Sequence, residues 1–181
     1  MALRSGDFQS VRANSPASEP GKLLTRMVTI HNGARISKVA RLRLCCSAAI
    51  LDEQDRILLI QRDDDHRWIS PGGAIEAGES VSEACVREIF EETGLQSRVK
   101  RLLGIYSNVD HIFEYPDGNR WQHIDLFFLC EIVGGDLRTT AEALDARFFG
   151  RDELATLDMH EVDRVRILRD VFPPPEGVIL R

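Results

Sequence analysis

The 181-residue chain contains no apolar run long enough to cross a membrane, since a spanning helix needs about 20 predominantly apolar residues. Its first twenty residues, MALRSGDFQSVRANSPASEP, also lack the continuous apolar core of a signal peptide. These two absences argue against helical membrane spans and against a secretory leader. We therefore expect a cytoplasmic protein with no membrane partner.

Paired cysteines are missing as well. The four cysteines show no CxxC spacing, and each lies in an apolar stretch, so we expect buried thiols rather than metal ligands or a disulfide framework. The five histidines are scattered along the chain, and metal binding by them is not expected. His66 and His111 nevertheless lie in predicted loops that could reach a cleft.

An excess of positive charge is also absent, because 29 acidic residues face 23 basic ones and the net charge is −6. Without a concentrated basic stripe, sequence-independent binding of nucleic acid is not expected, and capped RNA is a poor candidate substrate. A polyphosphate whose charge is neutralised by a metal ion remains compatible. The apolar content of 43% is sufficient for one substantial core.

What the chain does contain is a strongly acidic predicted helix. Ser80, followed three residues later by Glu83, forms a capping-box pattern, and Gly94 is suited to end a helix in the left-handed conformation. The pattern predicts a helix from about Val81 to Thr93. We expect its buried side to hold Val81, Cys85, Val86, Ile89 and Phe90.

Glu88, Glu91 and Glu92 fall within one arc of about 100° on this helix. Their charges repel one another, and Arg87 can pair with Glu91 but cannot neutralise all three. Because oxygen ligands without Cys or His favour Mg²⁺ or Mn²⁺ over Zn²⁺, the pattern predicts a site for one of these ions. Ala84, one turn earlier, would leave room for a hydrated ion and a phosphate. The simpler alternative is a solvated acidic face.

The segment GAIEAGESVSEACVREIFEETGL, residues 73–95, carries a longer pattern. It resembles the Nudix box, G-x5-E-x7-R-E-U-x-E-E-x-G-U, at every specified position. The matching residues are Gly73, Glu79, Arg87, Glu88, Ile89, Glu91, Glu92, Gly94 and Leu95.

The resemblance to Nudix hydrolases implies an α+β fold, a Nudix-like α/β/α sandwich with a mixed β-sheet. It also implies hydrolysis, dependent on Mg²⁺ or Mn²⁺, of a phosphoanhydride bond in a nucleoside diphosphate linked to another moiety, such as ADP-ribose or a nucleotide sugar. The products would be a nucleoside monophosphate and a phosphorylated second product. A homodimer that exchanges N-terminal elements is common in this family.

By the same resemblance, Glu88, Glu91 and Glu92 are the metal ligands, and Glu91, Glu92, Glu142 and Arg87 are the catalytic residues. Either Glu91 or Glu142 could take the proton of the attacking water. Glu142 is assigned because family members often carry an acid about six residues before an aromatic strand residue, here Phe148. Asp145 is a rival for this role, and an ordinary surface position is the alternative.

The remaining positions of the box receive structural roles. Gly73 and Gly94 would allow close approach of the backbone and the end of the helix, respectively. Glu79 would either orient Arg87, join the outer shell of the metal or serve the dipole of the helix.

Substrate recognition lies outside the box. The candidate substrate-binding residues are Arg62, Trp68, Phe113 and Tyr115, and Trp121 is a further aromatic side chain that could stack on a base. Packing in the core or in loops is the alternative for each aromatic residue. The chain lacks the proline and the tyrosine that mark family members acting on ADP-ribose and on dinucleoside polyphosphates, so the nucleotide stays open.

Three alternatives to this function stay open. A nucleoside triphosphate pyrophosphohydrolase that removes damaged nucleotides is the first alternative. A non-catalytic nucleotide-binding module is less favoured, since its expected signature is a broken box. An isomerase on the same fold would need a Cys and Glu pair, for which Cys85 and Cys130 are the candidates.

We expect three regions: an N-terminal arm, residues 1–38, partly flexible or in contact with a dimer partner; a Nudix domain, residues 39–173; and a tail, residues 174–181. The predicted strands are 41–51 and 56–62, paired antiparallel across a turn, then 97–107, 111–115 and 121–133, paired across a turn at 116–118, and 146–149. Helices are predicted at 151–157 and 160–171.

Overall fold

The computed structural model describes residues 28–141 and 143–181. Most of the predicted N-terminal arm and the predicted catalytic residue Glu142 lie outside the described residues. The strands are β1 (Thr29–Asn32), β2 (Arg41–Ile50), β3 (Ile57–Arg62), β4 (Trp68–Ile69), β5 (Gly72–Ala74), β6 (Leu95–Tyr106), β7 (His111–Glu114), β8 (Arg120–Gly135), β9 (Ala143–Phe149) and β10 (Ile179–Leu180). The helices are α1 (Val81–Thr93) and α2 (Glu161–Asp170), with short 3₁₀ turns η1 (Ile36–Val39) and η2 (Glu153–Ala155).

Within the described residues the strands form two sheets. The larger one has the order β1-β7-β8-β2-β5, with β6 on β8 and β10 on β6. It is mixed, because β2 runs parallel to β8 whereas β6 and β7 run antiparallel to it. The smaller sheet has the order β4-β3-β9.

The predicted antiparallel pairing of residues 41–51 with 56–62 is wrong. The turn between them is present, and Asp52 stabilises it by accepting hydrogen bonds from the backbone of Gln54 and Arg56. Only one bridge, Leu51 with Ile57, follows it. Beyond this bridge β2 pairs with β5 and β8, while β3 joins the smaller sheet. Both strands are apolar, and an apolar strand does not by itself specify its partner.

The helix α1 begins and ends where the sequence predicts. The Ser80 hydroxyl accepts from the Glu83 amide and the Glu83 carboxylate accepts from the Ser80 amide, which completes the capping box. Gly94 ends the helix with φ 74°. The predicted helix at 151–157 is only the short turn η2, whereas the second predicted helix is α2.

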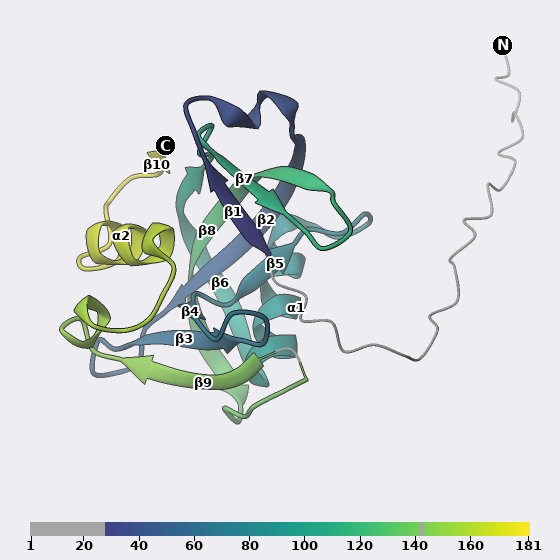
Figure 1. Ribbon diagram of the computed structural model, residues 1–181. Helices are drawn as coiled ribbons and strands as arrows, with labels where there is room; N and C mark the ends of the chain where they lie inside the picture. Colours follow the sequence, from purple (N-terminus) through teal and green to yellow (C-terminus); the bar gives the residue numbers. More distant parts are fainter. Residues whose placement is uncertain (1–27, 142) are drawn as a thin grey trace, which may run out of the picture.

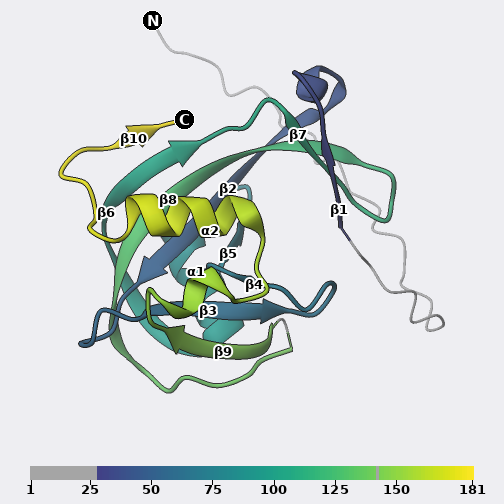
Figure 2. The same ribbon diagram turned by 60° about the vertical axis from the view of Figure 1, so that its left-hand side comes forward.

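The two helices lie on opposite sides of the larger sheet (Figures 1 and 2). Alternate residues of β2 and β8 divide the interior into two clusters. Cys46, Ala48, Phe128 and Cys130 pack with α1, and Ala49 and Phe127 pack in the cluster that includes Ile167 of α2. A mixed sheet between two helices confirms the predicted α+β sandwich.

The C-terminal residues return to the larger sheet, because β10 adds to β6 in parallel and Arg181 exchanges backbone hydrogen bonds with the Ile105–Ser107 segment. The predicted boundaries at residues 38 and 174 stay predictions. Among the described residues no helix has the length and apolar character needed to cross a membrane.

We predict that Gly94→Ala destabilises the fold by about 1 to 2 kcal/mol, since a side chain in the left-handed region is strained. An added Cβ would also lie 2.9 Å from the carbonyl oxygen of Asp136. Chemical denaturation measures the change. Gly177→Ala is the matched control, because its Cβ would meet no atom within 4 Å. Equal stability of the two variants would contradict the prediction.

Candidate active site

Arg87 organises the acidic face of α1. Its Nε and Nη2 donate to the two carboxylate oxygens of Glu79, at 3.0 and 2.7 Å. Its Nη1 donates to Glu88 and to Glu91, both at 2.9 Å, and Nη2 also reaches the carbonyl oxygen of Ala74. One guanidinium therefore ties the loop before the helix, the strand β5 and two of the three helical glutamates together.

This network shifts proton affinities in a consistent direction. The hydrogen bonds that Arg87 donates to Glu79 raise the pKa of Arg87 well above its usual range. The hydrogen bonds from Arg87 lower the pKa of Glu79. Arg87 is therefore permanently charged, and Glu79 is ionised at neutral pH. Of the roles considered for Glu79, orientation of Arg87 is the one this geometry supports.

Glu88 and Glu92 face the strand β5. The Glu92 carboxylate accepts the backbone N–H of Gly72 at 2.8 Å, and the Glu92 side chain is buried. A Cβ built on Gly73 would lie 2.4 Å from an oxygen of Glu88, closer than atoms can approach. Only glycine at this position leaves the Glu88 carboxylate its place.

The three helical carboxylates differ in environment. Glu91 has 40% of its side-chain surface exposed, against 13% for Glu88. In residues 28–141 and 143–181 no three His, Cys, Asp or Glu side chains converge closely enough to hold a metal ion. Glu88 and Glu91 accept hydrogen bonds from Arg87, and Glu92 accepts one from the Gly72 amide of β5. The metal-ligand assignment stays a prediction.

Two details of the predicted helix faces are wrong. Ala84 is fully buried in the core, so it provides no room for a hydrated metal ion. Val81 and Phe90 were expected on the buried side but are 38% and 45% exposed. The buried face is centred on Ala84, Cys85 and Ile89, and is thus rotated relative to the prediction.

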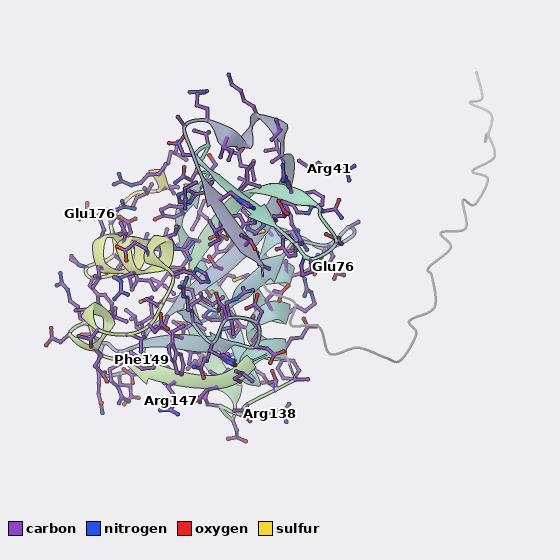
Figure 3. The ribbon with its side chains drawn as sticks, in the orientation of Figure 1. Arg41, Glu76, Arg138, Arg147, Phe149 and Glu176 are labelled. Atoms are coloured by element: carbon purple, nitrogen blue, oxygen red, sulfur yellow. The ribbon has the colours of Figure 1, made fainter. Side chains whose placement is uncertain are left out.

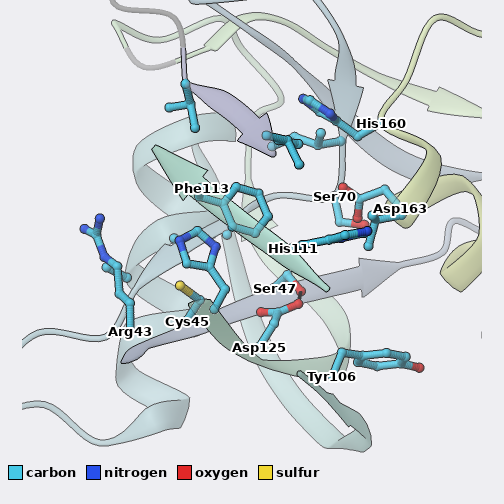
Figure 4. Close-up of a pocket in the computed structure, with 18 of the residues that line it drawn as sticks. Arg43, Cys45, Ser47, Ser70, Tyr106, His111, Phe113, Asp125, His160 and Asp163 are labelled. Carbon is cyan, nitrogen blue, oxygen red and sulfur yellow. Dashed lines mark hydrogen bonds between the residues drawn. The ribbon is translucent and has the colours of Figure 1, made fainter. Parts of the chain in front are cut away.

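On the other side of the larger sheet lies a cavity of about 350 Å³. Its floor includes Cys45 and Ser47 of β2 and Asp125 of β8, and the strand β5 forms one edge. Figure 4 shows Phe113 and His111 above this floor, with His160 and Asp163 at the side of α2. A volume of this size lies at the lower end of the range for small-molecule pockets.

One end of the cavity is aromatic and cationic. The rings of Phe113 and His123 stack with centroids 4.0 Å apart and planes 3° apart. The Arg43 guanidinium lies over the rings of Tyr115 and Trp121. Burial, reinforced by the charge of Arg43, lowers the pKa of His123 to about 4, so this imidazole is neutral at physiological pH.

The opposite end of the cavity is acidic. Asp125 accepts the Ser47 hydroxyl at 2.6 Å and also pairs with Arg166 of α2. Arg166 pairs in addition with Asp163, and its guanidinium lies 4.0 Å from the centroid of Phe127. The guanidinium is thus held by two carboxylates and a ring, in a buried position.

A second cleft lies beside the first cavity and contains Glu92. The two hollows share four lining residues: Val28, Arg62, Ile69 and Tyr115. The cavity and the cleft that contains Glu92 therefore adjoin along this shared wall.

Three of the four predicted substrate-binding residues line the hollows, and one does not. Arg62 and Tyr115 lie in the shared wall, and Phe113 lines the cavity. Two hydrogen bonds from Arg62 to the Asp64 carboxylate partly neutralise the Arg62 guanidinium. Trp68 lines neither hollow. It is buried edge-on against Phe149, whose position on β9 is labelled in Figure 3.

The remaining predicted side chains can also be placed. His111 lines the cavity, whereas His66 does not. Asp145 lies on β9 and pairs with Arg147. The four cysteines are free thiols, and three of them, Cys46, Cys85 and Cys130, are buried as expected. Cys45 is half-buried in the cavity floor, where burial raises its pKa to about 12.

The cavity contains residues that the sequence analysis missed, namely Ser47, Ser70, His123, Asp125 and Arg166. One signal was present in the sequence. Asp125 interrupts the apolar run IDLFFLC, and a charged residue within a buried strand requires a partner. Arg166 gave no such signal, because an arginine in an amphipathic helix is ordinary.

Comparison with known proteins identifies the family of the chain. The NUDIX domain family model matches residues 41–171. The chain belongs to the Nudix family. Divalent metal ions are generally needed by Nudix hydrolases.

Several members are close relatives. An "ADP-ribose pyrophosphatase" of Methanocaldococcus jannaschii is 38% identical over 125 residues, covering 67% of this chain and 68% of the relative. A "putative 8-oxo-dGTP diphosphatase" of Bacillus subtilis is 46% identical over 86 residues, covering 48% of this chain and 51% of the relative. The crystal structure of a "UDP-X diphosphatase" superposes with a TM-score of 0.63 at 25% identity, covering 81% of this chain and 72% of the other. The chain is therefore a hydrolase of the pyrophosphatase type.

We predict that Gly73→Ala lowers activity by at least about 10-fold, because displacement of a catalytic group by a fraction of an ångström is costly. The added methyl would occupy the place of the Glu88 carboxylate. Steady-state kinetics with a nucleotide substrate measures the loss. The control is Gly33→Ala, whose Cβ would make ordinary contacts with Ile36 at 3.6 Å. Full activity of Gly73→Ala would contradict this geometry.

A second prediction concerns pH and stability. Because the folded-state pKa of His123 is lowered to about 4, the unfolded chain binds a proton more readily between pH 4 and about 6.5. His123 therefore contributes stability above pH 6.5 that is lost as the pH falls through this window, by at most about 3 kcal/mol. Urea unfolding from pH 7.5 to 4.5 should show a shallower pH dependence for His123→Gln than for the native chain. Equal slopes would show that His123 titrates normally.

Proposed function

We propose that this protein uses Mg²⁺ or Mn²⁺ to hydrolyse the phosphoanhydride bond of a nucleoside diphosphate linked to another moiety. The products are a nucleoside monophosphate and a phosphorylated second product. ADP-ribose and nucleotide sugars are examples of substrates of this type. One relative carries the name of an ADP-ribose pyrophosphatase, and one structural neighbour is named as a UDP-X diphosphatase.

The observation that carries the proposal is the shared wall between the two hollows. Arg62 and Tyr115 line both the cavity of about 350 Å³ and the cleft that contains Glu92. A ligand with its nucleoside in the cavity would pass its diphosphate over this wall towards the carboxylates of α1. The aromatic rings that line the cavity suit a nucleoside.

The donor set of α1 fits a hard divalent cation, since Glu88, Glu91 and Glu92 offer oxygen atoms only. These three residues would hold the metal, which supplies charge neutralisation and an acidified water when bound. To coordinate the ion, Glu88 and Glu91 would give up part of their hydrogen bonding to Arg87. The Gly73 position leaves space for the Glu88 carboxylate on the side of β5.

Arg87 acts in this account as a positioning residue, because its five hydrogen bonds join Glu79, Glu88, Glu91 and Ala74. Glu91, the most exposed of the three helical glutamates, is suited to accept the proton of the attacking water, and Glu142 is the alternative base. Glu92 would bind the metal while its other contact, to the Gly72 amide, keeps β5 in place.

A nucleoside triphosphate pyrophosphohydrolase is the alternative activity. The similarity to a putative 8-oxo-dGTP diphosphatase favours it, although that match covers only about half of each chain. The products separate the two activities. The triphosphate reaction releases pyrophosphate, and the proposed one releases a phosphorylated organic product.

Two other functions find less support. A non-catalytic module would be expected to lack box residues, but every box position is present and the Arg87 network is complete. An isomerase would need an accessible thiol near a carboxylate. Cys85 and Cys130 instead face each other in the core, Sγ to Sγ 3.8 Å apart, and this contact together with burial raises the pKa of Cys85.

The homodimer and the cytoplasmic location stay predictions from the sequence. Light scattering coupled to gel filtration would measure the oligomeric state directly.

The test is turnover of a panel containing ADP-ribose, nucleotide sugars, CDP-alcohols, dinucleotides and nucleoside triphosphates, each with Mg²⁺ or Mn²⁺ and with chelator. We expect one group of substrates to be hydrolysed only with metal. Glu92→Gln should lower kcat by about 100-fold or more, because it removes both a ligand charge and an acceptor.

Glu131→Gln is the matched control, since Glu131 pairs with Arg98 and Lys100 on the β6–β8 ladder, outside both hollows. It should retain native turnover. If no member of the panel is hydrolysed, or if Glu92→Gln is as active as the control, the proposed function is wrong.

A further inference from the structure

Three buried polar atoms that line the cavity lack hydrogen-bond partners among the described residues. They are the Nε2 of His123 at the aromatic end, the Ser70 hydroxyl and the Nε of Arg166. Arg166 pairs with Asp163, and Figure 4 shows Ser70 beside Asp163, so the last two atoms belong to the acidic end. Ser70 is 3% and Arg166 is 7% exposed. An unsatisfied buried donor costs about 1 to 3 kcal/mol, and such groups are rare unless a ligand or water meets them. The acidic end of the cavity thus offers two hydrogen-bond donors to a ligand.

The same end offers two acceptors. Asp125 accepts from Ser47 and Arg166 through one oxygen, Oδ2, and Asp163 accepts from Arg166 through Oδ1. No described residue donates a hydrogen bond to Asp125 Oδ1 or to Asp163 Oδ2. A carboxylate can accept through both of its oxygens, so each of these residues retains an acceptor next to the donors described above.

The charge of this end determines which part of a nucleotide it can take. Two carboxylates and one guanidinium leave one net negative charge, which repels phosphate. The cationic groups Arg43 and Arg62 line the other parts of the cavity and the shared wall. A bound nucleotide would therefore place its base at the acidic end and its phosphates towards β5.

The common bases differ in the edge that they present. Guanine alone has a carbonyl oxygen followed by two neighbouring N–H donors. Uracil has one N–H between two carbonyls, and adenine and cytosine each have a ring-nitrogen acceptor beside the amino group. An acceptor facing a carboxylate is repelled, and a site built to hydrogen-bond one edge strongly rejects another.

We propose that this cavity binds a nucleobase with the guanine pattern of hydrogen-bonding groups, and that Asp125 determines the preference. Ser70 or Arg166 donates to the carbonyl oxygen of the base. Asp125, with Asp163 beside it, accepts from the ring N–H and the amino group. The proposal rests on the proposed function for the nucleotide nature of the ligand. Guanine and 8-oxoguanine share this edge and are distinguished by experiment.

Isothermal titration of the native chain with GMP, 8-oxo-GMP, AMP, CMP and UMP tests the proposal without any hydrolysis. The phosphate is common to all five ligands, so differences report the base. We expect GMP or 8-oxo-GMP to bind at least about 10-fold more tightly than the other three, the discrimination of a well-placed pair of hydrogen bonds. Whichever of GMP and 8-oxo-GMP binds more tightly shows whether guanine or 8-oxoguanine is the natural base.

Two variants assign the preference to residues. Asp125→Asn replaces an acceptor by a donor of the same shape, and the advantage of GMP over AMP should fall about 10-fold or more. Ser70→Ala removes a hydroxyl that no described residue bonds, so the fold should be unaffected while GMP affinity falls several-fold. Asp52→Asn, which alters an Asp–Arg pair at an exposed turn, is the control and should bind like the native chain.

Tighter binding of AMP, CMP or UMP, or no preference among the five, would overturn the proposal. So would a GMP preference that survives in both folded variants, with folding checked by circular dichroism. These results are independent of the hydrolysis panel. A guanine preference without turnover would refute the proposed function and leave this inference standing. Turnover without a guanine preference would refute this inference and leave the proposed function standing.

Discussion

The rest of the site depends on the close contact between α1 and the short strand β5. β5 pairs with β2 through Cys45, Cys46 and Ser47, so its position is set by the larger sheet. On the other side the Glu88 carboxylate lies where a side chain of residue 73 would be, and Glu92 accepts the Gly72 amide. β5 contacts α1 and also lines the cavity, so the acidic helix and the cavity on the opposite face of the sheet lie close together.

Charge is distributed so that each part of the site is compensated locally. Arg87 holds Glu79, Glu88 and Glu91 around one cation, and Arg166 holds Asp125 and Asp163 around another. Buried carboxylates without such partners would be strongly destabilising. The first cluster keeps an excess of negative charge, which suits a divalent ion. The second is further from α1 and directs its hydrogen-bonding atoms into the cavity.

Local sequence rules were sufficient for the helix that carries the box. The capping box of Ser80 and Glu83 and the terminating Gly94 involve residues close in the chain, and the structure forms all of these contacts. The turn at residues 116–118 and the pairing of β7 with β8 are local in the same sense. The α+β sandwich followed from the order of elements and from the resemblance carried by the box.

Long-range partners were not predictable in this way. The sequence could not show that β2 leaves β3 to pair with β8, about 80 residues later in the chain, because an apolar strand fits several neighbours. The three-residue strand β5 has two glycines and no apolar alternation, so it was read as a loop. The cavity combines β2, β8 and α2, and Asp125 and Arg166 meet across 41 residues. The aromatic residues show the same limit, since Phe113 lines the cavity and Trp68 fills the core.

The central claim is that the carboxylates of α1 and the cavity across β5 form one site for one nucleotide. Mn²⁺ bound to the native chain broadens the nuclear resonances of a nearby ligand, steeply with distance. With the non-hydrolysable α,β-methylene analogues of ADP and GDP, we expect Mn²⁺ to broaden the ³¹P resonances strongly and the H8 resonance of the base much less, and Glu88→Gln to abolish both effects. If Mn²⁺ broadens neither resonance, or broadens H8 as much as ³¹P, the metal and the base do not occupy the two sides of β5 and the account is wrong.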